Sequence, residues 1–332
     1  MPAAPSCPAL PDLLGLLRQF VLQIPRGRVT TFGDLAVALG DVKAARWVAT
    51  VLSAIRAEEQ DKLPWHRVLL QTGRWPGSSP VEHDRQRKLL AAEGLVTVPA
   101  GLTPGFSRFT EFEGPAPLSD LMQWQRDIAR LVSTQPLKSE VRGLAGLDVS
   151  YASPELAVGA WVQYSADAPE ASGHFTQSQT VNFPYIPGYL TFRELPVLLS
   201  LVASAADQFP ADVLLVDGSG ILHPRRAGIA ATLGVLIGRP TIGITKHRLH
   251  GTVEAAQTGH VVWLADKGER IGARLQPPDD RPPLYVSVGS GLSLEQAVEI
   301  VLAQLGPHGQ PRPIFAADRL SRQVARSLKG KP

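Results

Sequence analysis

Residues 212–220 read DVLLVDGSG, an apolar run followed by an acid and glycines. A continuous apolar run of this length, bounded by turn residues, is typical of a strand that is buried on both faces of a sheet. The segment RPTIGITK at 239–246 has the same character. These two segments predict central strands of an α/β domain.

The surrounding segments extend this pattern. Further strands are predicted for GLAGLDVSY (143–151), LAVGAWVQY (156–164) and PLYVSVGSG (283–291), and helices for SDLMQWQRDIARLV (119–132) and LSLEQAVEIVLAQLG (292–306). A short turn at 152–155 separates the first two of these strands. Ser293 and Gln296 have the spacing of a capping box, which marks the start of the last helix.

Two of the predicted strands carry a carboxylate in an apolar setting. Asp148 lies inside one strand, and Asp217 ends another. A buried carboxylate is costly unless it is paired or binds a cation. If the fold brings the two acids together, they suit Mg²⁺, which prefers carboxylate oxygens. Separate structural roles for the two acids are the alternative.

Residues 30–55 have a helical pattern. TTFGDLAVALG (30–40) predicts a helix with Thr31 as N-cap and Gly40 just past its end, and Asp41 would cap a second helix in DVKAARWVATVLSAI (41–55). Its apolar face comprises Ala44, Val48, Val51, Leu52 and Ile55, and its opposite face comprises Arg46, Thr50 and Ser53, with Lys43 at the edge. Such a pair resembles a helix-turn-helix, whose second helix enters a DNA groove, although an ordinary amphipathic pair has the same pattern.

The length of 332 residues favours two domains. Between them, residues 99–118 read PAGLTPGFSRFTEFEGPAPL, with four prolines, three glycines and no regular period. We therefore expect a first domain at 10–98, a linker at 99–117 and a second domain at 118–332.

Composition limits the class of protein. The charge is +3, and all of it lies in residues 1–100, which hold 12 basic and 9 acidic residues. This distribution favours a polyanionic partner for the first domain, or is without meaning at so small an excess. The single cysteine, Cys7, excludes an internal disulfide and fits a reducing cytoplasm. We expect a cytoplasmic protein with no membrane contact, since no signal peptide or spanning segment is recognisable.

Four motifs of the first domain resemble one known family. IPRGRVTTFGDLAVALG (24–40), AARWVA (44–49), LPWHRV (63–68) and AAEG (91–94) resemble, in order and spacing, the DNA-binding domain of O6-alkylguanine-DNA alkyltransferases. In that family a cysteine accepts the alkyl group, and here Trp65 stands in its place. An indole has no comparable nucleophilicity at neutral pH. The domain thus resembles the alkyltransferase-like proteins, which bind O6-alkylguanine without removing the alkyl group.

The resemblance implies roles for individual residues. Arg46 would enter the duplex and fill the space of the flipped nucleotide, and Trp65 would line the alkyl pocket or merely plug it. The remaining residues implied to bind the lesion are Phe32, Pro64, His66 and Arg67. Phe32 stands where the family usually has Tyr, so the chain lacks a hydroxyl that helps to rotate the nucleotide.

The second domain resembles endonuclease V. The motifs are GLDVSY (146–151), PYIPGYLTFRELP (184–196), VDGSGILHPRRAGIA (216–230) and TIGITKHRLHG (241–251). The resemblance implies an RNase H-like fold with a central mixed sheet. It also implies Mg²⁺- or Mn²⁺-dependent cleavage of the second phosphodiester bond 3′ of deoxyinosine.

By position, Asp148, Glu194 and Asp217 match the acidic metal-binding and catalytic triad of that family, and His223 and Lys246 match further catalytic residues. Tyr185 matches a wedge that replaces an extruded base, and Gly188, Gly218 and Ile229 match residues around that base. Arg225 and Arg226 are candidates for phosphate contacts or for a structural turn. Ser219 stands where the family often has His or Asn, and Ser290 stands where it often has His. These two differences weaken the expectation of a second metal ion.

Together these features favour a DNA repair enzyme that binds O6-alkylguanine without alkyl transfer and nicks damaged DNA with a divalent metal. Its expected partner is double-stranded DNA with damaged bases, with nucleotide-excision-repair proteins as a further candidate. Two alternatives stay open: a non-catalytic lesion-binding protein that recruits other repair factors, and an inosine-specific ribonuclease.

Overall fold

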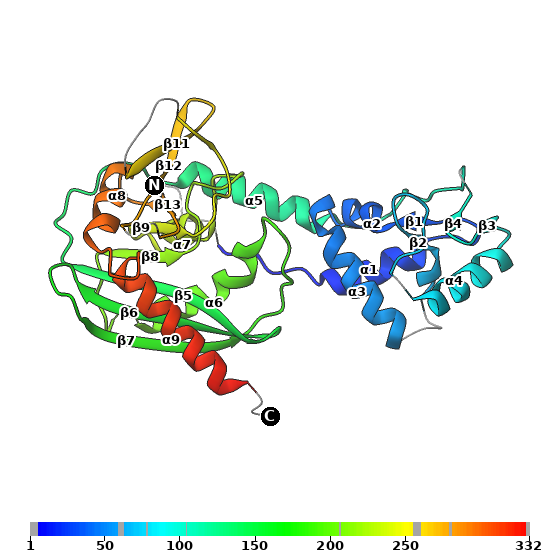
Figure 1. Cartoon of the computed structure of the whole chain (residues 1–332), viewed down its shortest axis with the longest axis horizontal. Coiled ribbons are helices and arrows are strands. Elements are labelled where there is room, and N and C mark those ends of the chain that lie inside the picture. Colours follow the sequence, from blue (N-terminus) through cyan, green and yellow to red (C-terminus); the bar gives the residue numbers. More distant parts are fainter. Residues whose placement is uncertain are drawn as a thin grey trace. The chain divides into compact units, whose positions relative to one another are not determined.

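The computed structural model describes residues 6–58, 63–77, 79–103, 105–205, 207–254, 260–278 and 281–329, without the side chains of 55–58. The chain forms two compact units. One holds Leu10–Met122 and Pro184–Gly188, and the other holds the remaining described residues. The two are therefore described separately, and Figure 1 names their elements.

The first unit is mainly helical. Its elements are α1 (Leu13–Gln23), β1 (Thr30–Thr31), α2 (Phe32–Ala38), α3 (Ala45–Glu58), β2 (Val68–Leu69), α4 (Pro80–Ala92), β3 (Thr97–Val98), β4 (Gly101–Leu102) and the start of α5 (Pro117–Leu131), with short 3-10 turns at Val42–Ala44 and Trp65–Arg67. The strands are only two residues long, and β1 pairs in parallel with β2. The mainly helical character expected of this unit is confirmed.

The α2–α3 pair forms where the sequence predicts it. Thr31 is the N-cap of α2 and forms a capping box with Asp34, and Gly40 has a φ of 108°, in the region that favours glycine. Asp41 caps a 3-10 turn that leads into α3. Ala44, Val48 and Leu52 are buried. Helix α3 thus has an apolar inner face and an outer face on which Arg46 is exposed.

The segment 99–117 contacts the first unit. The Val29 N–H donates to the Ser107 carbonyl, and the Phe109 N–H donates to the Val29 carbonyl. The Leu102 N–H donates to the Gly73 carbonyl, and Leu102 and Phe109 are buried. The two compact units divide after Met122, inside α5. Proline and glycine in this segment therefore accompany an irregular but packed path.

The second unit is built on one mixed sheet of nine strands. Their spatial order is β10-β11-β12-β13-β9-β8-β5-β6-β7. The bounds are β5 (Gly143–Ser153), β6 (Leu156–Ser165), β7 (Ala171–Thr180), β8 (Val213–Asp217), β9 (Thr241–Thr245), β10 (Thr252–Val253), β11 (Val261–Asp266), β12 (Glu269–Leu275) and β13 (Leu284–Ser290). The pairs β5–β8 and β8–β9 are parallel, and the other pairs are antiparallel. The α/β fold class with a central mixed sheet is confirmed.

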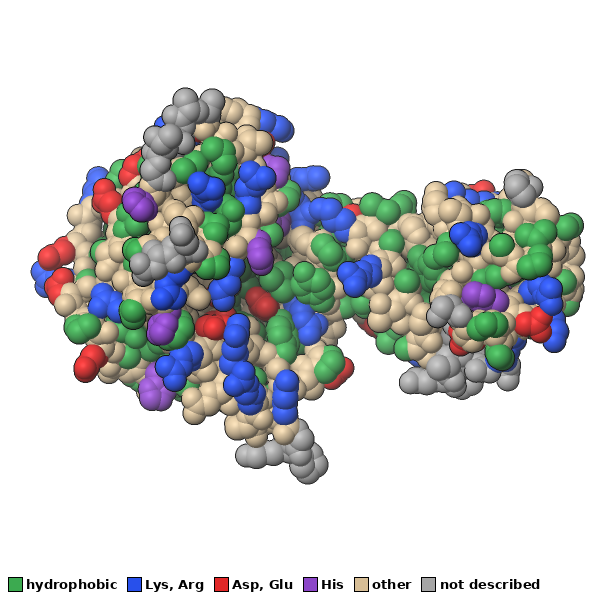
Figure 2. Space-filling view, in the orientation of Figure 1, with side chains coloured by type: hydrophobic (Ala, Val, Ile, Leu, Met, Phe, Trp, Pro, Cys, Tyr) green, Lys and Arg blue, Asp and Glu red, His purple; other side chains and the backbone are tan. Residues whose placement is uncertain are grey.

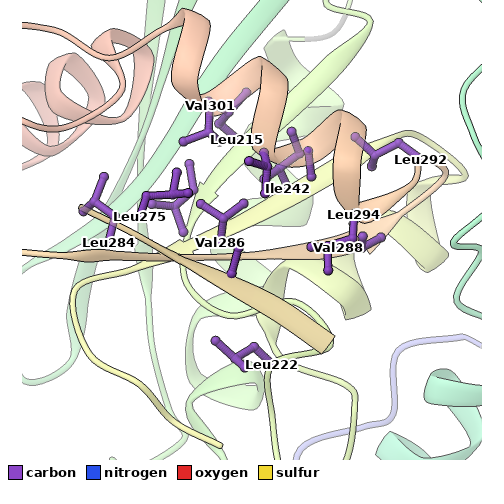
Figure 3. Packing of buried hydrophobic residues seen from close by; sticks show 14 of the residues in the cluster. Leu215, Leu222, Ile242, Leu275, Leu284, Val286, Val288, Leu292, Leu294 and Val301 are labelled. Carbon is purple, nitrogen blue, oxygen red and sulfur yellow. The ribbon is translucent and has the colours of Figure 1, made fainter. Parts of the chain in front are cut away.

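Helices cover both faces of this sheet. They are α6 (Leu190–Ala205), α7 (Ile229–Ile237), α8 (Leu294–Ala303) and α9 (Arg312–Leu328). On one face, α6 and α7 pack on Leu147 and Trp161. On the other face, α8 packs on Leu215 and Ile242, and Figure 3 shows this layer. Helix α9 contacts β5 and β6 on the same side as α8.

One glycine decides how closely α9 approaches the sheet. A Cβ built on Gly146 in β5 would lie 2.1 Å from the Pro313 carbonyl oxygen. A larger residue would therefore push the start of α9 away from β5. No described helix has the length and apolarity needed to cross a lipid bilayer.

Candidate metal centre and base pocket

Three acids of the second unit meet at the sheet. Leu147 pairs with Val216 in the parallel β5–β8 register, so that the next residues, Asp148 and Asp217, lie side by side. Asp318 from α9 joins them, and one carboxylate oxygen of each acid lies within 4.8 Å of the others. The structure thus brings together the two acids predicted from the strands and adds a third.

The three acids are largely shielded from solvent, and two protein cations lie near them, Lys246 and Arg322. Asp148 is 7% exposed, and the Asp318 side chain is 13% exposed. Burial, followed by repulsion from Asp148, raises the pKa of Asp217 to about 7, and Lys246 opposes that rise. Burial likewise raises the pKa of Asp148. Clustered carboxylates of this kind retain protons near neutral pH because they are buried and their negative charges repel one another. A hard divalent cation can displace these protons and bind the carboxylate oxygens.

Glu194 reaches the same region from the opposite layer. It lies on α6 and is 8% exposed. Its Oε1 accepts a hydrogen bond from the Tyr151 hydroxyl at 3.0 Å, and the Arg193 guanidinium lies 4.6 Å from the centre of the Tyr151 ring. Burial, and then repulsion from Asp148 and Asp217, raises its pKa to about 8. Glu194 is therefore an electrostatic neighbour of the cluster, held by a tyrosine.

These residues fit a bound Mg²⁺ or Mn²⁺. Asp148, Asp217 and Asp318 would supply carboxylate oxygens, and Glu194 would add a fourth carboxylate nearby. Buried acids without enough cations are unfavourable unless something positive joins them. The expected set of Asp148, Glu194 and Asp217 is thus enlarged by Asp318.

Of the other expected catalytic residues, Lys246 acts on the cluster by its charge, and His223 lies in the loop that follows β8. Lys246 follows β9 directly and is exposed, and its charge acts on Asp217. His223 is 6% exposed, and its Nδ1 accepts from the Arg225 N–H at 3.2 Å. That bond leaves the ring proton on Nε2 in the neutral form.

Ser219 and Ser290 serve the backbone. The Ser219 hydroxyl donates to the Leu222 carbonyl at 2.6 Å, and the Ser290 hydroxyl accepts from the Ser133 N–H at 3.1 Å. Both hydroxyls are buried parts of the fold around the loop that follows β8.

The loop after β8 is tightly packed. Gly218 has a φ of 157°, and a Cβ there would lie 2.3 Å from Cγ2 of Ile229, so these two predicted base-binding residues are in contact. The Arg225 Nε donates to Gln125 Oε1 at 2.7 Å, and its guanidinium lies 4.8 Å from the centre of the Tyr189 ring.

Arg226 also has protein partners. It forms ion pairs with Asp266 at 3.0 Å and Glu269 at 3.4 Å, and its φ of 57° is unusual for arginine. These contacts fit the role of Arg225 and Arg226 in a structural turn, the alternative to phosphate contacts. Neither side chain needs a phosphate to be held in place.

The loop at 184–188 carries Tyr185, the residue predicted to act as a wedge. Tyr185 is 64% exposed, which is unusual for a large aromatic side chain. Pro184 and Pro187 flank it, and Gly188 has a φ of 84°, in the region that favours glycine. Prolines restrict such a loop before any ligand binds.

The first unit contains a small cavity at Trp65. Its lining consists of Phe32, Leu52, Ser53, Trp65, Val68 and Pro76. Trp65 is 4% exposed, and the Arg85 guanidinium lies 5.8 Å from its ring centre. The pocket therefore offers mainly apolar and aromatic surface. Cys7, the single cysteine, packs in the core of the second unit instead.

Behind this pocket lies an ion network. His66 Nε2 lies 2.8 Å from Glu93 Oε1, and the Arg67 guanidinium donates to both oxygens of Glu93. The Gly27 N–H donates to Glu93 Oε2 at 3.2 Å. Burial opposes ionisation of Glu93, but the bonds from Arg67 and His66 outweigh it and lower its pKa to about 2. Burial lowers the pKa of His66 despite Glu93.

Of the predicted lesion-binding residues, Phe32 and Trp65 share the cavity. Pro64 precedes the 3-10 turn at Trp65–Arg67, while the His66 ring and the Arg67 guanidinium contact Glu93. Arg46 lies on α3 with an exposed side chain. The charged members of this set thus divide between a structural network and an open surface.

Sequence reasoning missed Asp318, Tyr151 and Glu93. Asp318 lies on the same face of α9 as Ile314 and Ala317, both buried. An acid that interrupts an apolar stripe of a helix was the available signal. Glu93 lies within the AAEG motif, but nothing local names its partners.

The comparisons with known proteins match both units. The model of the endonuclease V family matches residues 126–319, and the model of the 6-O-methylguanine DNA methyltransferase DNA-binding domain matches residues 17–95. A bifunctional methyltransferase/endonuclease of Picrophilus torridus is 32% identical over 291 residues, which is 87% of this chain and 89% of the relative.

Solved structures match the second unit. The catalytic domain of human endonuclease V superposes with a TM-score of 0.59 at 31% identity, covering 66% of this chain and all of the human domain. Endonuclease V of Ciona intestinalis, in complex with DNA containing an inosine followed by a ribo-adenosine, gives a TM-score of 0.59 at 26% identity and covers 64% of this chain and all of that one.

Proposed function

Because the chain belongs to the endonuclease V family and carries an alkyltransferase-like DNA-binding domain ahead of it, we propose that it binds O6-alkylguanine in duplex DNA by base flipping, transfers no alkyl group, and nicks damaged strands with a divalent metal. The substrates are strands with deoxyinosine or O6-alkylguanine, cut 3′ to the lesion. The observation that carries this proposal is the buried cluster of Asp148, Asp217 and Asp318. Tethering the two domains raises the local concentration of substrate at the nuclease.

The first domain binds the damaged base without removing its alkyl group. Its pocket places an indole, which accepts no alkyl group at neutral pH, where a thiolate would be needed. The cavity walls of Phe32, Leu52 and Val68 suit the flat face of a base and a small alkyl substituent. Arg46, exposed on α3, would occupy the space that the flipped nucleotide leaves in the duplex.

The second domain performs the hydrolysis. A bound Mg²⁺ or Mn²⁺ would polarise the scissile phosphate and make hydroxide available near pH 7. Asp148, Asp217 and Asp318 would hold that ion, with Glu194 beside them. His223 would orient the attacking water, and Lys246 would stabilise the leaving oxygen by its charge.

Basic side chains are exposed on α9, the helix that carries Asp318. Lys and Arg gather over the C-terminal half of α9 in the space-filling view (Figure 2). Arg319, Arg322 and Arg326 are exposed there. Such a surface would attract the phosphates of the strand to be cut.

A nicking assay tests this function. End-labelled duplexes with deoxyinosine, O6-methylguanine or only undamaged bases, and an inosine-containing RNA, would be incubated with protein in Mg²⁺ or in excess chelator. We expect metal-dependent nicks 3′ to a damaged base and no methyl label on the protein. Tight lesion binding without any nick would select a recruiting role instead, and cleavage of the RNA alone would select a ribonuclease.

A further inference from the structure

A fully buried serine of α9 contacts the acid cluster. Ser321 is 0% exposed, and its hydroxyl donates a short hydrogen bond to Asp148 Oδ2. The Ser150 hydroxyl lies 2.9 Å from the Ser321 hydroxyl and 3.5 Å from Asp148 Oδ2. A chain of two hydroxyls therefore ends on one oxygen of Asp148.

The proton of Ser321 has three possible acceptors: Asp148 Oδ2, the Ser150 hydroxyl and the Asp318 carbonyl. Besides Asp148, the Asp318 carbonyl lies 3.0 Å away, at the i−3 position of the same helix. Serines in helices commonly donate to such carbonyls. A carboxylate oxygen accepts a stronger hydrogen bond than a carbonyl or a hydroxyl oxygen does, because it carries charge. Asp148 therefore takes the proton of Ser321.

One segment of α9 thus supplies both an acid and a donor. Asp318 and Ser321 are three residues apart, so they lie on the same face of the helix. The close approach of α9 to β5 at Gly146 brings this face down onto the strand that carries Asp148. Arg322 pairs with Asp318 at 2.8 Å. Asp148 and Asp318 thus each have a side-chain partner on α9, Ser321 and Arg322 respectively.

We propose that Ser321 is a positioning residue of the metal centre, which holds Asp148 Oδ2 so that the other oxygen of Asp148 faces Asp217 and Asp318. Without it, a buried carboxylate between two other acids would turn away from them, because repulsion within the cluster favours separation. Ser321 touches neither substrate nor cation in this role. The inference rests on the proposed metal-dependent function.

Binding of Mn²⁺, measured by electron paramagnetic resonance on the full chain, tests the inference without DNA. Ser321→Ala should bind Mn²⁺ about 10- to 100-fold more weakly than the parent, the usual loss when a partner of a metal ligand is removed. Ser327→Ala is the matched control, since Ser327 lies on the same helix and donates to the Val324 carbonyl at 2.8 Å, also at i−3, but is exposed. The control should bind Mn²⁺ like the parent.

A second variant protects the test against misfolding. Ser321→Cys has a similar volume and a weak donor, and should bind Mn²⁺ with an intermediate affinity. Metal-free thermal unfolding would show whether each variant is folded. If folded Ser321→Ala, or Ser321→Cys where the alanine variant does not fold, binds Mn²⁺ as tightly as Ser327→Ala, the inference is wrong.

The outcome for the inference is separable from the outcome for the function. A parent protein that binds Mn²⁺ but nicks no duplex contradicts the proposed nuclease, while the Ser321 comparison still stands or falls on Mn²⁺ affinity. A parent that binds no Mn²⁺ overturns both. A nicking rate that recovers in Ser321→Ala at high Mn²⁺ would add support, since positioning affects metal affinity before it affects the chemical step.

Discussion

Both units bury acids, but with opposite consequences for their ionisation. In the first unit, Glu93 lies between Arg67, His66 and a backbone N–H, and its pKa falls to about 2. In the second, Asp217 and Glu194 lie beside other acids, and their pKa values rise to about 7 and about 8. The same chemical group is thus stabilised as an anion in one place and strongly disfavoured as an anion in the other.

The difference separates structure from function. Glu93 has a cation within the fold, because Arg67 pairs with it and also donates to the Ile24 carbonyl at the end of α1. The acids of the second unit lack enough protein cations, which is tolerable for a site that receives one from solution. A buried acid is therefore informative mainly through the charges of its neighbours.

The largest expected effect comes from removing an acid of the cluster. Asp217→Ala should reduce the nicking rate by about 10³-fold or more, because the metal that makes the nucleophile would be lost. Lesion affinity, measured by fluorescence anisotropy, should change less than about twofold, since the first unit binds without metal. Asp207→Ala, at an exposed acid of the same unit, is the control. Unchanged nicking in Asp217→Ala would remove the catalytic assignment.

Arg46→Ala should reduce discrimination between O6-methylguanine and plain duplex by about 10-fold. The guanidinium acts in the damaged complex by filling the stack, whereas a phosphate contact would act on both duplexes. Lys43→Ala, in the 3-10 turn that leads into α3, is the comparison and should weaken both complexes equally. An equal loss on both duplexes for Arg46→Ala would contradict the intruding role.

Stability should respond in opposite directions in the two units. Glu93→Gln should destabilise the protein by about 2 kcal/mol at neutral pH, because Arg67 loses its charged partner. The effect is no larger because solvent partly screens this ion pair. Because the pKa of Glu93 is lower in the folded than in the unfolded protein, its carboxylate stabilises the fold at pH values above the ordinary pKa of 4.5. This stabilisation is lost as the pH falls toward 2. Chemical denaturation should therefore show parent and variant converging in that window. A constant difference down to pH 2 would contradict it.

Metal-free Asp217→Asn should instead be more stable than the metal-free parent by about 2–4 kcal/mol above pH 7. Here the folded-state pKa is raised, so the stability of the parent is greatest below 3.8 and falls as the pH rises through about 7. The same denaturation series in chelator measures this difference. A variant that is less stable than the parent at pH 8 would show that Asp217 is not strained by its neighbours.

The smallest effect is expected at Tyr151. Tyr151→Phe removes the hydroxyl that donates to Glu194 but keeps the ring over which Arg193 lies. Nicking should fall by about 2- to 10-fold, the range for one lost hydrogen bond of ordinary strength. Steady-state rates at saturating Mg²⁺ would measure it. A rate equal to that of the parent would mean that Glu194 needs no such support.

Local signals predicted local features of this fold correctly. The N-cap Thr31 and the capping box of Ser293 and Gln296 depend on residues three apart, and both are present. The meeting of Asp148 and Asp217 could be suspected, because both lie on apolar strands, but the parallel register of β5 with β8 was needed to show it.

Long-range features were beyond the sequence. Ser321 lies 173 residues from Asp148, and only the packing of α9 on Gly146 brings the two together. Likewise, Glu93 lies 26 residues from Arg67, and no periodicity within either segment relates them. Contacts between distant segments are set by how layers pack, which a one-dimensional pattern does not encode.

Anomalous diffraction from a crystal of the full chain soaked in Mn²⁺ tests the contrast between the two units most directly. The predicted map has a manganese peak among the carboxylates of Asp148, Asp217 and Asp318, and none at Glu93, whose cation is already in the protein. A soaked crystal whose three carboxylates hold no manganese would contradict the account.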